Sequence, residues 1–528
     1  KLEKTISMNI CGYVLKKNST DQQLGIKGVA VSNGREVVLT NDDGYFELRE
    51  RDPCFIMVTK PSGYQFQLNE KKRYDFFYLH NSQGTPKQEN LLFKKISPTQ
   101  PITEPLRFYL ETSQGEDQFE MIMMGDIQPK SETDIGYFRD MVAKELALQN
   151  VSFYVVLGDL VWDRLELYPL LEDTLTAINI PYYTACGNHD INLRASSKKY
   201  ATETYKACYG PTYYSFNVGK THFVVLEDVG YSGWDDILEE KGEVYGWLDE
   251  VQLIWLENDL QYVPEDFLVV LLSHIPIYTA TASNNDYRNI LNRSDLFKIV
   301  ANRKKLLAVS AHTHCIEHVD LQEAGWNGEF PFKALIAGAA CGAWWKGPLD
   351  PNGLPVKMAM DGAPNGFFKF IFTGNEYKYD FVPIGFNQEH QMNIYFPSGE
   401  LNQNAFEKET IVVNIFNASP EAKVEYSINN GEWMDLERSV QPDPYVNRFV
   451  EDHKESYPEW MRARVTAHLW KAKSKVQLKE GIHNVIVRAV EPDGRSFIGK
   501  KVFRILDEEI VKLNKPGSNT QRELISSS

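Results

Sequence analysis

Five short apolar runs in the middle of the chain are followed by side chains that commonly bind divalent metal ions. The runs cover residues 119–124, 153–157, 181–186, 267–272 and 306–311. These side chains are carboxylates, amides and histidines. In chain order, the five runs are followed by Asp126 and Gln128, by Asp159, by Asn188 with His189 and Asp190, by His274, and by His312 with His314.

The types and spacing of these side chains suit a site for two metal ions. In open α/β sheets, ligands bind beyond the carboxyl ends of the strands, so the five ends should converge. Asp126 with Gln128, and His312 with His314, are two residues apart, and in extended chain both members of such a pair point the same way. Two carboxylates, two amide oxygens and three imidazoles suffice for two divalent cations that share one carboxylate. This mixture favours manganese, iron, zinc or magnesium over metals selected by thiolates.

Each of these residues also has a purely structural interpretation. A single histidine or aspartate at a strand end is more often a cap or a hydrogen-bonded polar group than a metal ligand. Seven such side chains at five successive strand ends favour one shared site instead.

The elements that position these side chains are of the α/β class. The runs are short and nearly continuous in apolar residues, as strands buried on both faces are. Helical patterns lie between them. Ser131 and Asp134, for example, form a capping-box signal before apolar residues at helical spacing. We therefore expect strands alternating with helices over residues 117–385.

The two ends of the chain follow a different pattern. Residues 1–112 and 388–510 alternate apolar and polar residues between turn signals such as Asn33-Gly34 and Asp493-Gly494, which is typical of β-sandwiches. Residues 452–473 interrupt the second of these regions and are expected to be helical or irregular. Residues 511–528 form a polar tail. The sequence thus predicts an α/β domain flanked by two all-β sandwich domains.

The motifs at the strand ends resemble those of the calcineurin-like metallophosphoesterases. They read Gly125-Asp-Ile-Gln, Gly158-Asp-Leu-Val-Trp-Asp, Gly187-Asn-His-Asp, Ser273-His and Ala311-His-Thr-His, in the order of the family. The resemblance implies two sheets sandwiched between helices, and hydrolysis of a phosphoric ester by a water that two metal ions activate. It also implies the ligand sets: Asp126, Gln128 and His314 for one metal, Asn188, His274 and His312 for the other, and Asp159 as the bridge.

His189 is not expected to bind metal. In the family, the matching histidine faces the phosphate and protonates or stabilises the leaving oxygen, so the resemblance implies a catalytic role here. Either Asp190 or Asp163 would orient the ring through its other nitrogen, as carboxylates around metal sites commonly do.

Two positions depart from the family pattern. Gln128 stands where the first motif usually has histidine, and an amide oxygen is a harder and weaker ligand than imidazole. We therefore expect one exchangeable metal, manganese or magnesium. Similar glutamine motifs occur in family branches that cleave diphosphate bonds, so an active enzyme is still expected. Ala311 stands where glycine is usual, and a small residue should serve there.

The resemblance extends more weakly to the flanking regions. The N-terminal region resembles carboxypeptidase regulatory-like domains, and the C-terminal region resembles the β-sandwich that follows the catalytic domain in some bacterial metallophosphoesterases. Such three-part proteins look like exported enzymes. We therefore expect a location in the periplasm or at the cell surface, with the signal peptide absent from this sequence. The sandwich domains would be free to contact carbohydrate or protein.

A loop rich in glycine and proline after the last motif holds further candidates for substrate binding. Trp344 or Trp345 would line the pocket and Lys346 would meet a phosphate or leaving group, unless the loop is only packed at a domain interface. Arg164 and Arg194 closely follow two motifs and suit phosphate oxygens, although ordinary ion pairs are the more common use of such arginines.

The composition of the chain limits the classes of binding partner that we expect. The chain has 56 basic and 72 acidic residues in 528, a net charge of −16, so binding to a nucleic-acid backbone is not expected. Its apolar runs fall far short of the ~20 residues that a membrane-spanning helix needs.

The expected partner is a small phosphomonoester, phosphodiester or diphosphate, because the motifs are common to all three. The rival hypothesis is a surface or glycan-binding protein with a catalytically retired phosphoesterase scaffold, and the full ligand set argues against it.

Overall fold

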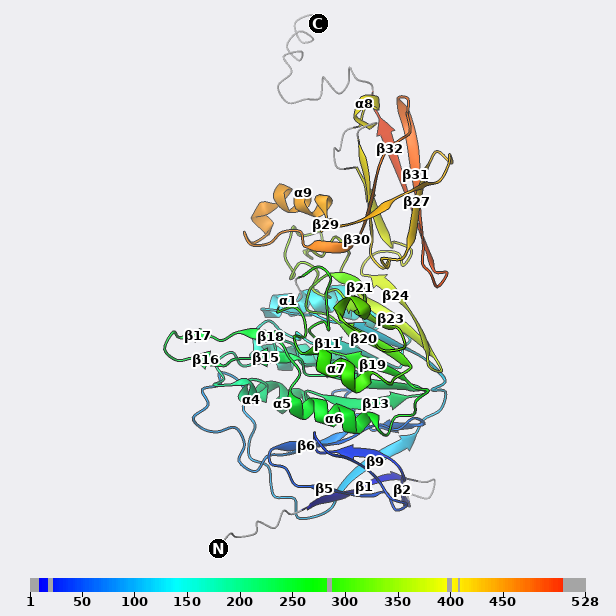
Figure 1. Cartoon of the computed structure of the whole chain (residues 1–528). Helices are drawn as coiled ribbons and strands as arrows, with labels where there is room; N and C mark the ends of the chain where they lie inside the picture. Colours follow the sequence, from blue (N-terminus) through cyan, green and yellow to red (C-terminus); the bar gives the residue numbers. More distant parts are fainter. Residues whose placement is uncertain (1–8, 18–21, 283–286, 397–400, 407–408, 507–528) are drawn as a thin grey trace, which may run out of the picture.

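The computed structural model describes residues 9–17, 22–282, 287–396, 401–406 and 409–506. Figure 1 shows three parts in a row: a sandwich built by the N-terminal residues, a central part with helices, and a second sandwich. The predicted architecture, an α/β domain flanked by two all-β sandwiches, is confirmed. The polar tail predicted at residues 511–528 lies outside the described residues. Within the described ranges, no helix combines the length and apolarity that crossing a bilayer requires.

The N-terminal sandwich has two sheets, β2-β1-β9-β7 with β5 also paired to β1, and β4-β3-β6-β8. Its Tyr74 ring stacks on Tyr183 of the central domain, and its Phe76 ring packs at a tilt against Tyr214, so the two domains share one hydrophobic core. The strands are β1 (Asn9–Lys17), β2 (Gln23–Gly25), β3 (Ala30–Ser32), β4 (Val37–Leu39), β5 (Tyr45–Arg49), β6 (Cys54–Val58), β7 (Tyr64–Phe66), β8 (Phe77–His80) and β9 (Leu106–Thr112).

The central domain contains two sheets packed face to face, ordered β12-β11-β10-β23-β24 and β13-β14-β19-β20-β22-β21. Strands β10 to β12 run parallel, as do β14, β19, β20 and β22. The strands of the two sheets are β10 (Gln118–Met124), β11 (Phe153–Leu157), β12 (Tyr182–Ala185), β13 (Tyr214–Val218), β14 (Thr221–Val225), β19 (Leu268–Leu272), β20 (Lys305–Ser310), β21 (Ile316–Asp320), β22 (Phe332–Ala337), β23 (Gly366–Thr373) and β24 (Glu376–Pro383). Two short ribbons lie outside them: β15 (Val229–Tyr231) with β18 (Val244–Gly246), and β16 (Trp234–Asp235) with β17 (Glu240–Lys241).

Both faces of the predicted apolar runs are buried, which explains why the runs are nearly continuous. In β10, Met121 and Met123 lie in the core between the sheets, whereas Ile122 and Met124 pack into the core on the other face. Ser131 caps the first helix by accepting a hydrogen bond from the Asp134 backbone N–H at 3.2 Å, as its sequence signal predicts. The helices are α1 (Glu132–Phe138), a π-helical turn (Arg139–Ala143), α2 (Lys144–Leu146), α3 (Tyr168–Ala177), α4 (Lys198–Ala201), α5 (Glu203–Tyr209), α6 (Glu250–Leu260) and α7 (Arg293–Val300).

The C-terminal sandwich has two four-stranded sheets, β25-β26-β30-β29 and β28-β27-β31-β32. Helix α9 (Pro444–Asp452) lies between β29 and β30, and the short α8 (Gln403–Phe406) precedes β26. The strands are β25 (Met392–Tyr395), β26 (Thr410–Ile415), β27 (Lys423–Ile428), β28 (Met434–Asp435), β29 (Glu437–Pro442), β30 (Val465–Lys473), β31 (Gly481–Val490) and β32 (Ser496–Ile505).

The sequence-based expectation for residues 452–473 is wrong over Val465–Lys473, which form β30, an inner strand of its sheet. The alternation typical of a strand is hidden because both faces of β30 are buried. Trp470 lies in the sandwich core, whereas His468 Nε2 lies 3.1 Å from Asp361 Oδ2 of the central domain. The C-terminal sandwich is therefore firmly docked on the central domain.

Candidate metal centre

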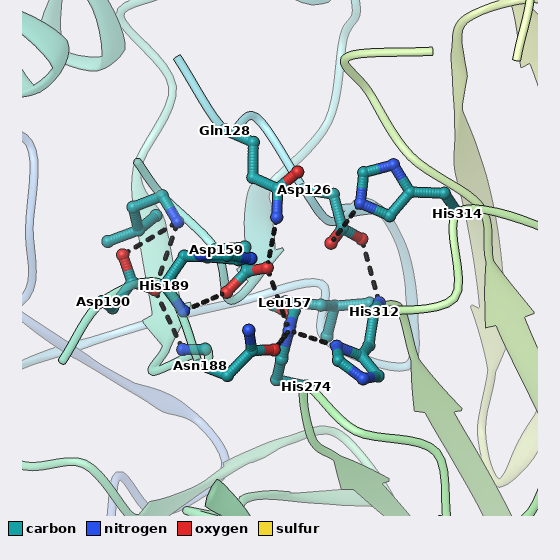
Figure 2. Close-up of polar contacts among 12 residues, drawn as sticks. Asp126, Gln128, Leu157, Asp159, Asn188, His189, Asp190, His274, His312 and His314 are labelled. Atoms are coloured by element: carbon teal, nitrogen blue, oxygen red, sulfur yellow. Dashed lines mark hydrogen bonds and ion pairs between the residues drawn. The ribbon is translucent and has the colours of Figure 1, made fainter. Parts of the chain in front are cut away.

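The seven predicted ligands lie together at the carboxyl ends of the parallel strands (Figure 2). Strand β10 leads to Asp126 and Gln128, and β11 leads to Asp159. The other ends carry Asn188 after β12, His274 after β19, and His312 with His314 after β20. The two central sheets thus both contribute to one polar cluster.

Asp126, Gln128 and His314 form one side of the cluster. His314 Nε2 lies 3.3 Å from Asp126 Oδ1. Within the described part of the chain, Asp126 Oδ1 and Gln128 Oε1 are buried oxygens without a hydrogen-bond partner. Buried polar atoms are almost always partnered, so two orphaned acceptor oxygens beside an imidazole fit a bound cation.

His274, His312 and Asn188 form the other side. His274 Nδ1 lies 2.8 Å from the Leu157 carbonyl oxygen, which accepts its proton and leaves Nε2 as the acceptor atom of the ring. That Nε2 lies 3.0 Å from Asn188 Oδ1 and 3.2 Å from His312 Nδ1. Lone pairs converging at such distances fit a divalent cation, and imidazole and amide groups suit zinc, iron or manganese.

Asp159 connects the two sides. Its Oδ2 accepts a hydrogen bond from Gln128 Nε2 at 2.6 Å and lies 3.3 Å from His274 Nε2. Burial favours the neutral carboxyl, but the charges of His274, His189 and His312 outweigh burial and hold the pKa of Asp159 far below its ordinary value. Burial likewise disfavours a charged His274, yet the Asp159 carboxylate raises the pKa of His274 to about 10. The pocket therefore stabilises a positive charge beside Asp159.

Five of the predicted ligands adopt a backbone conformation that is uncommon outside glycine. Their φ angles lie between 43° and 66°, in the left-handed region, at Asp126, Gln128, Asp159, His312 and His314. Such strained conformations gather at functional sites, where the surrounding structure holds them. Here the strand ends hold each other, since the Gln128 backbone N–H donates to the Asp159 carbonyl at 3.0 Å.

Two small residues let the motifs approach one another. A Cβ on Gly187 would lie 2.2 Å from Asp159 Oδ1, so only glycine lets the Asn188 loop approach this carboxylate. A Cβ on Gly125 would lie 2.2 Å from the Cβ of Ala311. The methyl group of Ala311 therefore occupies the space beside Gly125, which explains how alanine is accommodated where the family usually has glycine.

His189 stands beside the cluster, and its ring is oriented by Asp163. His189 Nδ1 lies 2.8 Å from Asp163 Oδ1. Burial disfavours the charged ring, but Asp159 and Asp163 outweigh burial and raise the pKa of His189. Asp190 does not contact the ring among the described interactions. Of the two candidate carboxylates, Asp163 is therefore the one that contacts the His189 ring.

The carboxylate of Asp190 is saturated by other donors. It accepts from the backbone N–H groups of Leu160 at 3.0 Å and Gly187 at 2.9 Å, and from the Tyr168 hydroxyl at 3.1 Å. It is fully buried. Through these contacts, Asp190 ties together the loops that carry Asp159 and Asn188.

The candidate substrate-binding residues of the long loop have three different environments. Trp344 stacks on His314, with ring centroids 4.3 Å apart and an interplanar angle of 22°. Trp345 is buried and donates from Nε1 to the Ile127 carbonyl at 2.8 Å, so it supports the loop between Asp126 and Gln128 instead of lining a pocket. Lys346 is partly exposed, with Nζ 4.0 Å from Asp134 Oδ1.

The two candidate arginines are both exposed. Arg164 pairs with Glu166, with 2.5 Å between Nε and Oε1, and Arg194 lies over the Trp234 ring at 5.0 Å from its centroid. Neither contacts a predicted ligand among the described interactions. These contacts match the alternative interpretation of the two arginines, in which they form ordinary interactions at the surface.

Two side chains beside the cluster were not singled out from the sequence. Trp162 packs against His189 with centroids 5.3 Å apart, and the Lys130 ammonium lies 3.3 Å from the centroid of Trp162. Trp162 lies inside the second motif, so the sequence could have indicated that it lies beside the site. Lys130 follows the first motif, but a single lysine there does not stand out from other surface lysines in the sequence.

Comparison with known families matches three stretches of the chain. These are the N terminal of Calcineurin-like phosphoesterase at residues 14–96, Calcineurin-like phosphoesterase at 121–316, and the C terminal of Calcineurin-like phosphoesterase at 335–497. The catalytic match includes all seven predicted ligands. The fold and these matches place the chain among the metallophosphoesterases. It belongs to the calcineurin-like phosphoesterase family.

Two curated proteins are similar to part of this chain. A stretch of 153 residues is 28% identical to the probable glycerophosphodiester phosphodiesterase GpdQ of Arcobacter nitrofigilis, covering 28% of this chain and 51% of that protein. A stretch of 144 residues is 28% identical to the serine/threonine-protein phosphatase CPPED1 of Homo sapiens, covering 26% and 43%. The chain thus spans about half the length of the curated relatives it matches. Among solved structures, it resembles purple acid phosphatase PPD1 from yellow lupin at 14% identity and a TM-score of 0.36 over 67% of each chain.

Proposed function

We propose that this protein hydrolyses small phosphoric esters with two divalent metal ions held at the strand ends of the central domain. The observation that supports this most is the place of Asp159, whose Oδ2 lies 2.6 Å from Gln128 Nε2 on one side of the cluster and 3.3 Å from His274 Nε2 on the other. Asp126, Gln128 and His314 would hold one ion, Asn188, His274 and His312 the other, and Asp159 would bridge them. Manganese, iron, zinc and magnesium are the candidate metals.

The chemistry divides between the ions and the chain. Two divalent cations at this place would polarise a water for in-line attack on phosphorus and neutralise the phosphate charge. His189 would supply the proton that the leaving oxygen needs. Asp163 would accept the Nδ1 proton at 2.8 Å, which leaves Nε2 as the atom that faces the leaving group. The raised pKa of His189 favours the protonated ring that this role requires.

The substrate would be a phosphomonoester, a phosphodiester or a diphosphate. A direct test measures hydrolysis of p-nitrophenyl phosphate, bis(p-nitrophenyl) phosphate and diadenosine diphosphate by metal-depleted protein reconstituted with each of the four metals. Asp159→Ala is the inactivating variant. Asp236→Ala, at an exposed aspartate between β16 and β17, is the matched control.

We expect wild type and Asp236→Ala to hydrolyse at least one substrate at similar rates, and Asp159→Ala to lose about 10³-fold or more of that activity, since it removes the shared ligand. The preferred substrate then gives the subclass. A wild type inactive with all four metals and all three substrates, or an Asp159→Ala variant as active as wild type, would contradict the proposal and favour the retired-scaffold hypothesis.

A further inference from the structure

Three tryptophans meet beside the candidate metal centre, and one of them comes from the C-terminal domain. Trp162 follows β11, Trp344 belongs to the long loop after β22, and Trp460 lies between α9 and β30. The Trp460 ring centroid is 5.2 Å from that of Trp344 and 6.4 Å from that of Trp162, in edge-to-face arrangements at 78° and 71°. We call these three rings the tryptophan cluster.

The cluster is continuous with the residues proposed to act on phosphate. Trp344 stacks on the predicted ligand His314 at 4.3 Å, and Trp162 packs on His189 at 5.3 Å. A phosphate bound at the strand ends, with its leaving oxygen toward His189, would direct the rest of the leaving group toward these rings. Aromatic rings so close to the reaction centre are in reach of that group.

One ring of the cluster is left open. Trp344 is buried, with His314 stacked on it and the Arg464 guanidinium 5.2 Å from its centroid. Trp162 is partly covered by Lys130, whose ammonium lies 3.3 Å from its centroid. Trp460, in contrast, is 55% exposed. A large ring held edge-on by two others and open to solvent is available to a ligand.

Trp460 is held in place by the segment around it. Tyr457 and Met461 on either side are buried in the core of the central domain, together with Val446 of α9. The Arg464 backbone N–H donates to the Met360 carbonyl at 2.8 Å, and the Gly347 backbone N–H donates to the Ser456 carbonyl at 3.2 Å. Figure 1 shows α9 extending sideways from the C-terminal sandwich above the central domain. The exposure of Trp460 is therefore fixed by packing on both sides.

Positive charge surrounds the cluster. Lys130 lies over Trp162 and Arg464 over Trp344. Lys346 adds a third cationic group, with its Nζ 4.0 Å from Asp134 Oδ1. The acidic side chains nearby are Asp134 and Asp163, which pairs with His189. Such surroundings suit a ligand that combines a flat ring with a phosphate.

We infer that the tryptophan cluster is a leaving-group subsite built by two domains, in which Trp460 of the C-terminal domain stacks on a ring of the phosphoric ester. The substrate class is thus an organic phosphate whose leaving group carries an aromatic base or a sugar ring close to the ester oxygen. This inference rests on the proposed function. It gives the C-terminal sandwich a role in substrate selection.

The test measures binding separately from catalysis. Benzylphosphonate and methylphosphonate are not hydrolysed as esters and differ by one ring, so calorimetric titration of metal-loaded protein with each isolates the ring contribution. The variants are Trp460→Ala and Trp460→Phe. Trp433→Ala is the matched control, because Trp433 is also a half-exposed tryptophan of the C-terminal domain, 42% exposed beside Arg488.

We expect wild type and Trp433→Ala to bind benzylphosphonate about tenfold more tightly than methylphosphonate, in line with stacking on one aromatic side chain. Trp460→Ala should lose that preference without weaker methylphosphonate binding, and Trp460→Phe should restore most of it. A preference that survives in Trp460→Ala, or an equal loss for both phosphonates, would overturn the inference. If neither phosphonate binds wild type, the phosphate site itself fails, and the proposed function falls with the inference.

A second comparison separates the two kinds of ring. We would measure competition with p-nitrophenyl phosphate hydrolysis by adenosine 5′-monophosphate, glucose 1-phosphate and glycerol 3-phosphate. If only the nucleotide competes more weakly in Trp460→Ala than in wild type, the ring that stacks on Trp460 is an aromatic base. If only the sugar phosphate competes more weakly, that ring is a sugar. Either result supports the subsite, whereas an unchanged order of all three in Trp460→Ala contradicts it.

Discussion

His189 is tied to the candidate metal centre at both its ring and its backbone. Its ring nitrogen Nδ1 lies 2.8 Å from Asp163 Oδ1, and its backbone N–H donates to Asp159 Oδ1 at 2.8 Å. The same carboxylate that joins the two sides of the cluster thus also fixes the position of the proposed acid. Movement of Asp159 would displace the ligands and His189 together.

Replacing His189 should affect poor leaving groups most. In His189→Gln, we expect kcat for an alkyl phosphate to fall about 10²–10⁴-fold, the usual contribution of a general acid. The fall should be much smaller for p-nitrophenyl phosphate, because nitrophenolate leaves without a proton. Steady-state kinetics on both substrates checks this. Equal losses on the two esters would show that His189 does not protonate the leaving oxygen.

Replacing Asp163 should mainly lower activity, whereas replacing Asp190 should lower stability and metal binding. Asp163→Asn should lower activity less than His189→Gln and leave metal content unchanged, because Asp163 contacts the ring and not a predicted ligand. Asp190→Asn should lower the melting temperature and the metal content, because Asp190 is buried and holds the Leu160 and Gly187 backbones. Thermal unfolding and metal analysis of both variants separate the roles, and the reverse pattern would refute the assignment.

Gly187→Ala should disrupt the metal centre. The added methyl group would lie 2.2 Å from both the backbone nitrogen and Oδ1 of Asp159, so the backbone and the carboxylate of Asp159 must both move away from their partners. We expect a loss of bound metal and a fall in melting temperature. Gly136→Ala in α1 is the control, since its new Cβ meets nothing closer than 3.9 Å. Full metal binding by Gly187→Ala would show that the position of Asp159 is not decisive.

A half-buried histidine at the interface with the C-terminal sandwich should make stability depend on pH. His318 Nδ1 lies 3.1 Å from the Tyr379 hydroxyl, and its Nε2 lies 3.1 Å from Asn417 Oδ1. Burial, above all, lowers the pKa of His318 to about 3. The other charged groups that act on it are Arg495, His468 and Arg438. In the unfolded chain its pKa is about 6.5.

Between these two pKa values, the unfolded chain binds a proton at His318 that the folded protein does not. The free energy of unfolding should therefore fall as the pH is lowered from about 6 to 4, by about 1.4 kcal/mol per pH unit from this group. His318→Gln should lose that part of the slope, and His483→Gln, at a partly exposed histidine, should keep it. Denaturant unfolding at several pH values checks this. The same slope in His318→Gln and wild type would contradict the prediction.

The candidate ligands could be located from the sequence because each follows a strand whose apolar run is local in the chain. Asp126 after β10 and His274 after β19 need only two facts: parallel strands end at one edge, and motifs at those ends converge. The choice between Asp163 and Asp190 could not be made this way. Both lie near His189, and only the folded loops decide which carboxylate faces the ring.

The position of Trp460 of the C-terminal domain could not be predicted from the sequence, for a different reason. Trp460 is brought to Trp344 and Trp162 by the packing of Tyr457 and Met461 in the core of the central domain, a contact between distant parts of the chain. β30 was hidden as well, because burial of both Leu469 and Trp470 removes the alternation that marks a strand. Docking between domains erases the local pattern on which such predictions depend.

The most direct test of the two-metal centre is the number of metal ions bound per chain. The protein would be stripped with a chelator, reconstituted with manganese, desalted and measured by elemental analysis, with Asp159→Asn beside it. We expect about two equivalents in wild type and one or fewer in Asp159→Asn, because Asp159 contacts both sides of the cluster. Wild type that binds no manganese, zinc, iron or magnesium, or an Asp159→Asn variant that keeps two ions, would contradict the two-metal site.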